Sequence, residues 1–258
     1  MTFSPASRSR LTTHDLGRFP ADTLFDRLAR AVCRAGCLPR KELYEAWEVA
    51  RRVRRHFRGG RIVDLAGGHG LLAQALLLLD NSSPEALVVD SVLPASAPTL
   101  HAALVDAWPR LADRVRFSAE DLGRVPLSAD DLVVGSHACG ALTDAVLNRA
   151  AAVRARVAVL PCCHDLDACD PGSLAGWLDP TLAVDVMRAV QLERQGYRVS
   201  TLTIPNRITP RNRLLIGAPP ASAPPDAPSA SAPSDAPPPL APDDAASVHT
   251  SPDALSGS

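Results

Sequence analysis

The sequence predicts an α/β protein built on a doubly wound sheet of seven strands, which are mostly parallel and end in an antiparallel hairpin. Short apolar runs alternate with longer helical stretches from residue 61 onward, as in parallel sheets that helices cover on both faces. The last two runs, YRVSTLTI at 197–204 and NRLLIGA at 212–218, are joined by too few residues for a helix, so they must pair antiparallel.

Two helices are expected before the sheet. Asp22 can cap a helix that Gly36 ends, and Pro39 opens a second helix whose apolar residues recur at helical spacing. Five arginines between residues 51 and 58 crowd the end of this second helix. Cations there suit the helix dipole and a solvated face, and they would also suit a phosphate backbone.

The remaining elements follow in the order of the chain. The five parallel strands are expected at RIVDLA (61–66), ALVVD (86–90), RVRFS (114–118), DLVVGS (131–136) and RVAVLP (156–161). Helices are expected between and after them at 71–79, 95–108, 142–152 and 174–195. The prediction is therefore one domain at 21–217, with an N-terminal helical extension at 21–58.

The two ends of the chain lack the apolar periodicity of packed elements. Residues 1–20 are predicted to be flexible, with Leu16 and Phe19 as the residues that can dock. Residues 218–258 are rich in Ala, Pro, Ser and Asp and are predicted to be a disordered tail, because they cannot bury enough apolar surface to offset the entropy of ordering. Five of the 28 acidic residues lie in this tail, so the predicted domain is mildly basic.

Composition also bears on the compartment. No run of about 18 uncharged apolar residues occurs, which excludes a membrane-spanning helix. The six cysteines lack the spacing of a disulfide scaffold, so reduced thiols and a cytoplasmic location are expected. The first 14 residues are rich in Arg and Ser and free of acids, which leaves an organelle transit peptide as the alternative.

The first predicted strand runs into the segment VDLAGGHGLLA at 63–73, where a glycine-rich turn precedes a helix. Gly67, Gly68 and Gly70 let the backbone turn tightly and approach a ligand, and the amide groups at the helix start face anionic groups. Asp90 ends the second predicted strand 20 residues after Gly70, where a carboxylate can accept hydrogen bonds from ribose hydroxyls. These four residues predict a cofactor that contains a nucleoside.

The identity of this cofactor depends on residues outside the turn, because the turn also fits the fingerprint of NAD-binding proteins. Three features favour S-adenosylmethionine. Asp64 lies within the first strand, where an acid can face the amino group of a methionine moiety. Glu120 and Asp121 follow the third strand, near the expected place of an adenine. The third feature is the terminal hairpin.

The fourth and fifth predicted strands end in SHACGALTD (136–144) and LPCCHD (160–165), and TPRNRLLI follows at 209–216. With these motifs the chain resembles, from about Arg40 to Ala218, the methyltransferase domain of the methyltransferase-like-25 family and of the glutathione-transferase C-terminal-domain-containing protein. More distantly it is similar to tRNA 2′-O-methyltransferases. The resemblance implies a Rossmann-like class I methyltransferase fold that binds S-adenosylmethionine at Asp64, Gly67, Gly68, Gly70 and Asp90, with RNA as one candidate substrate. The zinc-finger segments of the tRNA enzymes and the fused transferase part are missing, so neither substrate carries over.

The same two strand ends supply candidates for catalysis. Methyl transfer is an in-line displacement, and a base matters mainly when the acceptor is a hydroxyl. His137 and His164 are the candidate bases, with Asp144 as an orienting carboxylate, although inert histidines are equally common at strand ends. The fourth strand lacks the Asn/Asp-Pro-Pro-aromatic sequence of many amino-group methyltransferases, so amine acceptors are less favoured.

The cysteines at these strand ends leave other chemistry open. Cys139, with a second thiolate from the fifth strand end, suits methylation of a pyrimidine carbon, although the surrounding motifs differ from those enzymes. Zinc is not expected, because the adjacent Cys162 and Cys163 would project on opposite sides of a strand and C-x-x-C pairs are absent. Packed, reduced thiols are the default interpretation.

The prediction as a whole is an S-adenosylmethionine-dependent methyltransferase whose acceptor is unknown, with an RNA 2′-hydroxyl or base as a candidate. The alternatives are a non-catalytic nucleotide-binding adaptor and an NAD-dependent oxidoreductase. The sequence predicts no membrane partner and does not indicate an oligomeric state.

Overall fold

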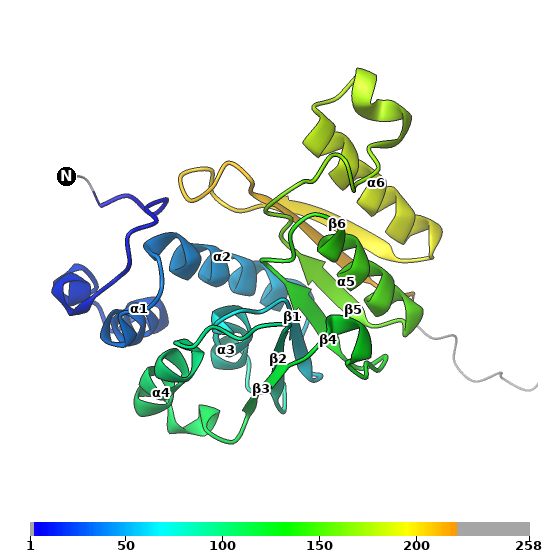
Figure 1. The fold of residues 1–258 in the computed structure, drawn as a ribbon. Coiled ribbons are helices and arrows are strands. Elements are labelled where there is room, and N and C mark those ends of the chain that lie inside the picture. Colours follow the sequence, from blue (N-terminus) through cyan, green and yellow to red (C-terminus); the bar gives the residue numbers. More distant parts are fainter. Residues whose placement is uncertain (1–2, 221–258) are drawn as a thin grey trace, which may run out of the picture. The chain divides into compact units, whose positions relative to one another are not determined.

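A computed structural model describes residues 3–220 of the protein, in which seven strands form one mixed sheet in the order β3-β2-β1-β4-β5-β7-β6 (Figure 1). The strands are β1 (Ile62–Leu65), β2 (Ala86–Asp90), β3 (Val115–Ala119), β4 (Leu132–Gly135), β5 (Arg156–Val159), β6 (Arg198–Thr203) and β7 (Arg213–Ala218). Strands β1 to β5 pair in parallel, whereas β7 pairs antiparallel with both β5 and β6. The predicted fold class, hairpin included, is confirmed.

Helices cover both faces of this sheet (Figure 1). They are α1 (Leu24–Ala35), α2 (Arg40–His56), α3 (Leu71–Leu79), α4 (Ala97–Ala107), α5 (Ala141–Ala152) and α6 (Pro180–Arg194). Short 3-10 turns lie at Thr13–Arg18, Pro109–Leu111, Leu122–Arg124 and Gly172–Gly176. None of the helices within residues 3–220 is long and apolar enough to cross a membrane.

Alternation along the strands divides the core into two layers. In β1, Ile62 belongs to the apolar cluster beneath α1 to α4, while the next residue, Val63, belongs to the cluster beneath α5 and α6. Both side chains are fully buried, as expected for a parallel sheet covered on two faces. By the same alternation Asp64 lies on the α3 side of the sheet.

Two helix starts differ from the prediction. Thr23, not Asp22, caps α1, since its hydroxyl accepts the Asp26 N–H at 3.1 Å. Helix α6 begins at Pro180 and not at 174, because the Asp179 side chain accepts the N–H groups of residues 181 and 182 and fixes the helix start there. At the other end of α1, Gly36 is left-handed, with φ of 66°, and ends the helix as predicted.

The described residues before α1, which the sequence predicted to be flexible, pack against the residues that lead into α2. Leu11 and Phe19 are buried, and the Leu11 N–H donates to the Leu38 carbonyl at 2.9 Å. The Arg40 guanidinium stacks 3.5 Å from the ring centroid of Phe3. These contacts join residues about 30 positions apart, so local apolar periodicity did not reveal them. The predicted tail lies, from residue 221 onward, outside the described residues.

One arginine of the cluster at the end of α2 is buried and does not belong to a cationic face. Arg54 is 3% exposed, and its guanidinium donates to the Leu76 carbonyl at 3.1 Å and to the Ser83 hydroxyl at 2.9 Å. It also pairs with Asp80 at 3.3 Å, which joins α2 to the segment after α3. Arg54 therefore stabilises the fold and is not available to bind a phosphate group.

Candidate functional site

The loop between β1 and α3 lies at the carboxyl ends of the parallel strands, next to the end of β2. The Gly68 N–H donates to Asp90 Oδ2 at 3.0 Å, and the Gly67 N–H donates to the Val89 carbonyl at 3.0 Å. The second carboxylate oxygen of Asp90 lies 3.4 Å from the Val92 N–H. The structure thus brings together the glycine turn and the strand-ending acid that the sequence singled out.

The three glycines of this turn are required for different reasons. A Cβ at Gly67 would lie 2.8 Å from Asp64 Cγ, and a Cβ at Gly70 would lie 2.7 Å from a methyl carbon of Val88. At Gly68, where φ is 53°, a Cβ would meet no atom of the described chain within 4 Å. Packing therefore explains Gly67 and Gly70, whereas Gly68 borders open space that a ligand can enter.

Asp64 lies beneath this loop and is 1% exposed. Neither of its carboxylate oxygens has a hydrogen-bond partner among residues 3–220. Burial raises the pKa of Asp64 to about 7. An unpartnered buried carboxyl of this kind is strongly stabilised by a cation or a hydrogen-bond donor that arrives with a ligand.

A cavity of about 250 Å³, here called the strand-end cavity, opens above the loop. It is lined by Glu42, Ala46, Ala66, Gly67, Gly68, His69, Leu71, Leu72, Asp90, Ser136, His137 and Leu142. The sequence did not single out Glu42 or His69. His69 stands inside the glycine turn, where its position was a usable signal, but Glu42 comes from α2 and no local pattern connects it to the strand ends.

A second cavity of about 200 Å³, here called the Asp121 cavity, shares Asp90 with the first. Its walls also include Ala66, Ser91, Asp121, Leu122 and Leu142. The predicted acid pair is thus divided, because Asp121 lines the cavity whereas Glu120 lines neither cavity and accepts the Ser118 hydroxyl.

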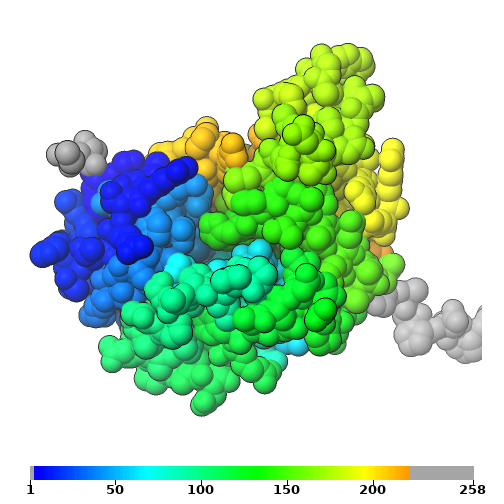
Figure 2. Space-filling view, viewed as in Figure 1, coloured from blue at the N-terminus to red at the C-terminus, as the bar shows by residue number. Residues whose placement is uncertain are grey.

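A third cavity of about 400 Å³, here called the cysteine cavity, shares only His137 with the strand-end cavity. It is lined by Ala6, Arg8, Lys41, Glu45, His137, Cys162, Cys163, Ile208, Thr209, Pro210 and Arg211. Figure 2 shows the two segments that close it, the blue N-terminal residues and the gold segment between β6 and β7, lying next to each other. The docked N-terminus therefore contributes to the site.

His137 stands between the strand-end and cysteine cavities, as expected for a candidate base. Its side chain reaches solvent, yet the surrounding protein displaces part of its water and, together with the Lys41 ammonium, lowers the pKa of His137. A lowered pKa keeps this imidazole neutral at pH 7 and able to accept a proton.

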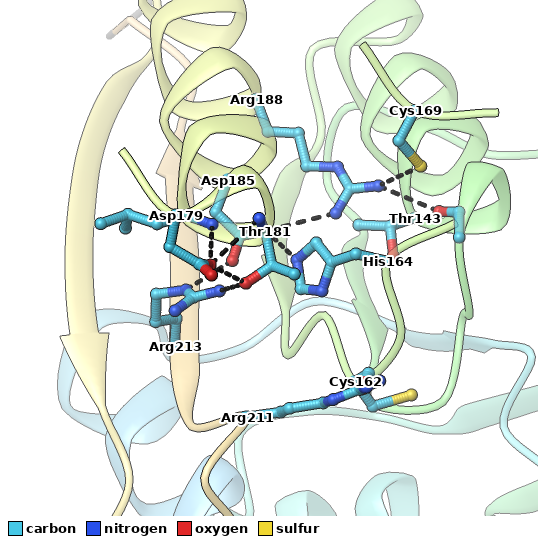
Figure 3. Close-up of polar contacts among 12 residues, drawn as sticks. Thr143, Cys162, His164, Cys169, Asp179, Thr181, Asp185, Arg188, Arg211 and Arg213 are labelled. Carbon is cyan, nitrogen blue, oxygen red and sulfur yellow. Dashed lines mark hydrogen bonds and ion pairs between the residues drawn. The ribbon is translucent and has the colours of Figure 1, made fainter. Parts of the chain in front are cut away.

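His164 and Asp144 do not form the arrangement that the sequence predicted. The His164 side chain is 1% exposed, and its Nε2 lies 2.8 Å from Asp185 of α6. Both Asp144 oxygens accept from Arg188 at 2.8 Å, so Asp144 orients neither candidate histidine. Figure 3 shows His164 beside Asp185 and Arg188, apart from Cys162. His164 and Asp144 therefore belong to an ionic network under α6. The sequence did not indicate Asp185 because it lies on a helix distant in the chain.

Three thiols meet beside the cysteine cavity. Cys139 Sγ lies 3.2 Å from Cys162 Sγ, and these two sulfurs and Cys163 Sγ all lie within 4.8 Å of one another. Cys162 and Cys163 do not project on opposite sides of a strand as predicted, because β5 ends at Val159 and both cysteines follow in an irregular segment.

A larger cavity of about 570 Å³ lies elsewhere, between α6 and the β6–β7 hairpin. Apolar side chains such as Leu182, Val190 and Leu215 dominate its walls. None of the residues that the sequence singled out for a site lines this cavity. The strand-end, Asp121 and cysteine cavities therefore remain the candidate site.

Comparison with known families identifies the segment that carries this site. Residues 41–168 match the model of a family described as "Methyltransferase domain". This match spans 128 of the 258 residues of the chain. It includes the glycine turn, Asp90 and all three clustered cysteines, whereas Arg8 and the segment at 208–211 lie outside the matched residues.

Solved structures of methyltransferases are similar to the chain. An O-methyltransferase family protein from Burkholderia thailandensis has 20% identity and a TM-score of 0.46, over 84% of this chain and 65% of that chain. The B. subtilis M1A22 tRNA methyltransferase TrmK has 12% identity and a TM-score of 0.44, over 66% of this chain and 64% of that chain. Precorrin-6y C5,15-methyltransferase from Geobacter metallireducens has 12% identity and a TM-score of 0.44, over 69% of this chain and 87% of that chain. No curated protein matches the sequence.

Proposed function

We propose that the protein is an S-adenosylmethionine-dependent methyltransferase that binds its methyl donor in the strand-end and Asp121 cavities. One observation carries this proposal. The Gly68 N–H and the Asp90 carboxylate are joined at 3.0 Å, at a point where the missing side chain of Gly68 leaves open space, inside the matched methyltransferase segment. The cavities on either side of this contact share Asp90.

The residues present fit the charge and shape of this donor. Asp90 accepts one hydrogen bond from the Gly68 N–H. An ionised carboxylate has about four acceptor positions, so the others remain available to ribose hydroxyls. Asp64 offers a buried carboxyl without a hydrogen-bond partner in residues 3–220, and a ligand with an ammonium and a sulfonium group favours its ionised form. Asp121 lines the cavity beyond Asp90, on the side assigned to adenine.

We assign the methyl acceptor to the cysteine cavity, because His137 lines both this cavity and the strand-end cavity. S-adenosylmethionine supplies, when bound, a methyl group on a sulfonium centre that an acceptor takes by in-line displacement, for which alignment provides much of the rate. His137 removes the proton of a hydroxyl acceptor, since its lowered pKa leaves it neutral at pH 7.

The walls of the cysteine cavity bear on the class of acceptor. Arg8, Lys41 and Arg211 line it together with the buried acid Glu45, whose carboxylate lies 3.1 Å from the Lys41 ammonium. Three cations beside one acid favour an acceptor that carries negative charge. RNA meets this condition and stays a candidate, as does the more specific resemblance to the methyltransferase-like-25 family.

Methyl transfer from labelled S-adenosylmethionine tests the proposal. The full-length protein is incubated with RNA, protein and small-molecule fractions, and the expected result is label in one fraction, lost with Asp90→Ala. Mass spectrometry of the labelled fraction, with RNA digested to nucleosides, then identifies the modified atom. Binding of S-adenosylhomocysteine without transfer to any fraction would favour the non-catalytic adaptor instead.

A further inference from the structure

The three-thiol cluster of Cys139, Cys162 and Cys163 joins two segments that are distant in the sequence. Cys139 lies between β4 and α5, whereas the other two follow β5. The Gly140 N–H donates to the Cys163 carbonyl at 3.0 Å, and Arg211 donates to the Cys162 carbonyl at 2.7 Å. The first contact holds the two cysteine segments together independently of the sulfur atoms, and the second adds a contact from the segment before β7.

The spacing of the sulfurs is close to that of a thiolate metal site. A tetrahedral zinc ion with Zn–S bonds of about 2.3 Å places its sulfur ligands about 3.8 Å apart. The Sγ atoms of the cluster lie within 4.8 Å of one another, and the shortest separation is 3.2 Å. Small side-chain rotations therefore suffice to place all three sulfurs around one ion.

Two cationic side chains lie beside the cluster. Arg211 and Lys41 line the adjoining cavity and offset the excess negative charge of three thiolates and one divalent ion. Thiolates select zinc over hard cations such as magnesium and calcium.

We propose that Cys139, Cys162 and Cys163 bind one zinc ion through their thiolates, with the fourth position left to water or to a molecule in the cysteine cavity. Three protein ligands and one open position are typical of zinc sites that act on a substrate, whereas structural zinc sites have four protein ligands. The site is separate from the proposed donor cavities, because no cysteine lines them.

Cobalt(II) titration of the reduced full-length protein tests this site. The wild type is expected to bind one Co²⁺ per chain, with a thiolate-to-metal charge-transfer band in the near ultraviolet that zinc abolishes. Cys139→Ser and Cys163→Ser are each expected to lose stoichiometric binding, because only two thiolates remain. Cys37→Ser is the matched control, since Cys37 is a free cysteine outside the cluster, and this variant should titrate as the wild type does.

A second measurement avoids any dependence on the folding of the variants. In the wild type, one equivalent of zinc should protect Cys139, Cys162 and Cys163 from alkylation, as read residue by residue from peptide masses, and should leave Cys37 as reactive as before. Equal alkylation of the three cysteines with and without zinc overturns the proposal. Failure of the fully reduced wild type to bind either Co²⁺ or Zn²⁺ also overturns it. Binding of S-adenosylhomocysteine to the wild type is measured in parallel. If the wild type did not bind it, the proposed function would be contradicted, whereas the zinc proposal would be unaffected.

Discussion

The Gly68 backbone N–H donates to the Asp90 carboxylate at 3.0 Å, which ties the glycine turn after β1 to the end of β2. The contact holds the carboxylate next to the space that Gly68 leaves open. Substitutions at these two residues should therefore affect the same property, ligand binding, by two different physical routes.

Filling the space at Gly68 should weaken binding of S-adenosylmethionine. We expect Gly68→Val to cost at least about 1.4 kcal/mol of binding free energy, a factor of ten. The matched control is Gly36→Val, because Gly36 also has a positive φ, 66° against 53°, and open space around its Cβ position, but it lies at the end of α1.

Both of these variants should lose about 1–3 kcal/mol of folding stability through backbone strain. Calorimetric titration and thermal unfolding measure the two effects separately. If Gly36→Val weakened binding as much as Gly68→Val, strain and not ligand space would explain the result.

Asp64 should make the ligand-free protein less stable as pH rises. Its pKa is about 7 when folded, against an ordinary value of 3.8, so between these values the unfolded chain releases a proton that the folded protein keeps. Stability is then lost as pH rises from about 4 to 7, by a few kcal/mol, since each pKa unit corresponds to about 1.4 kcal/mol.

Asp64→Asn should flatten this pH dependence, because the amide does not ionise. Urea unfolding at pH 5 and pH 8, without ligand, gives the comparison. The variant is expected to exceed the wild type in stability at pH 8, and an unchanged slope between the two pH values would show that Asp64 is not the titrating group.

The ionic network under α6 should support folding and not ligand binding. Arg188 is 2% exposed and pairs with both Asp144 and Asp185, so Arg188→Met leaves Asp144 without its ion-pair partner, while Asp185 keeps His164 and Arg213. Breaking a buried pair in this way costs about 3–5 kcal/mol.

Arg194→Met, an exposed arginine at the end of the same helix, should change stability by less than about 0.5 kcal/mol. Urea unfolding measures both variants, and S-adenosylmethionine affinity at a temperature where both are folded should match the wild type. Strong loss of affinity in Arg188→Met would show that the network reaches the donor cavities.

The two candidate histidines should behave differently. His137→Gln should reduce turnover and remove the acid limb of the pH–rate profile, because activity falls as pH drops through the pKa of His137 and the imidazole becomes protonated. Since the surrounding protein and Lys41 lower this pKa, the limb is expected below the ordinary value of about 6.5.

His164→Gln should lower stability and leave the pH–rate profile in place, because its side chain is buried against Asp185. The profile of kcat/KM against pH, taken with the acceptor that the transfer assay identifies, gives the comparison. An acid limb that survives in His137→Gln and disappears in His164→Gln would reverse the assignment.

The sequence predicted the sheet well because each buried strand is a short apolar run bounded by polar or glycine residues. It also predicted Gly68 and Asp90 together, since a turn after one strand and an acid at the end of the next are local signals whose spacing is set by the helix between them. The β6–β7 hairpin followed from the shortness of its connection. These features depend on contacts between neighbours in the chain.

Features that depend on distant contacts could not be predicted in the same way. Leu11 is buried and its backbone N–H donates to the Leu38 carbonyl. Asp144 is unavailable to a histidine because Arg188, 44 residues later, donates to both of its oxygens. Glu42 reaches the strand-end cavity from a helix that precedes the sheet. Zinc was not expected at the three thiols because the residues after β5 were assumed to continue the strand.

Competition between S-adenosylmethionine and NAD for the wild type and for Asp90→Ala tests the central claim most directly. Calorimetric titration should show that the wild type binds S-adenosylmethionine more tightly than NAD. Asp90→Ala should weaken that binding by about 1.5–3 kcal/mol, because it removes hydrogen bonds to a charged acceptor, while circular dichroism shows the variant to be folded. Tighter binding of NAD, or equal affinity of a folded Asp90→Ala for S-adenosylmethionine, would contradict the account.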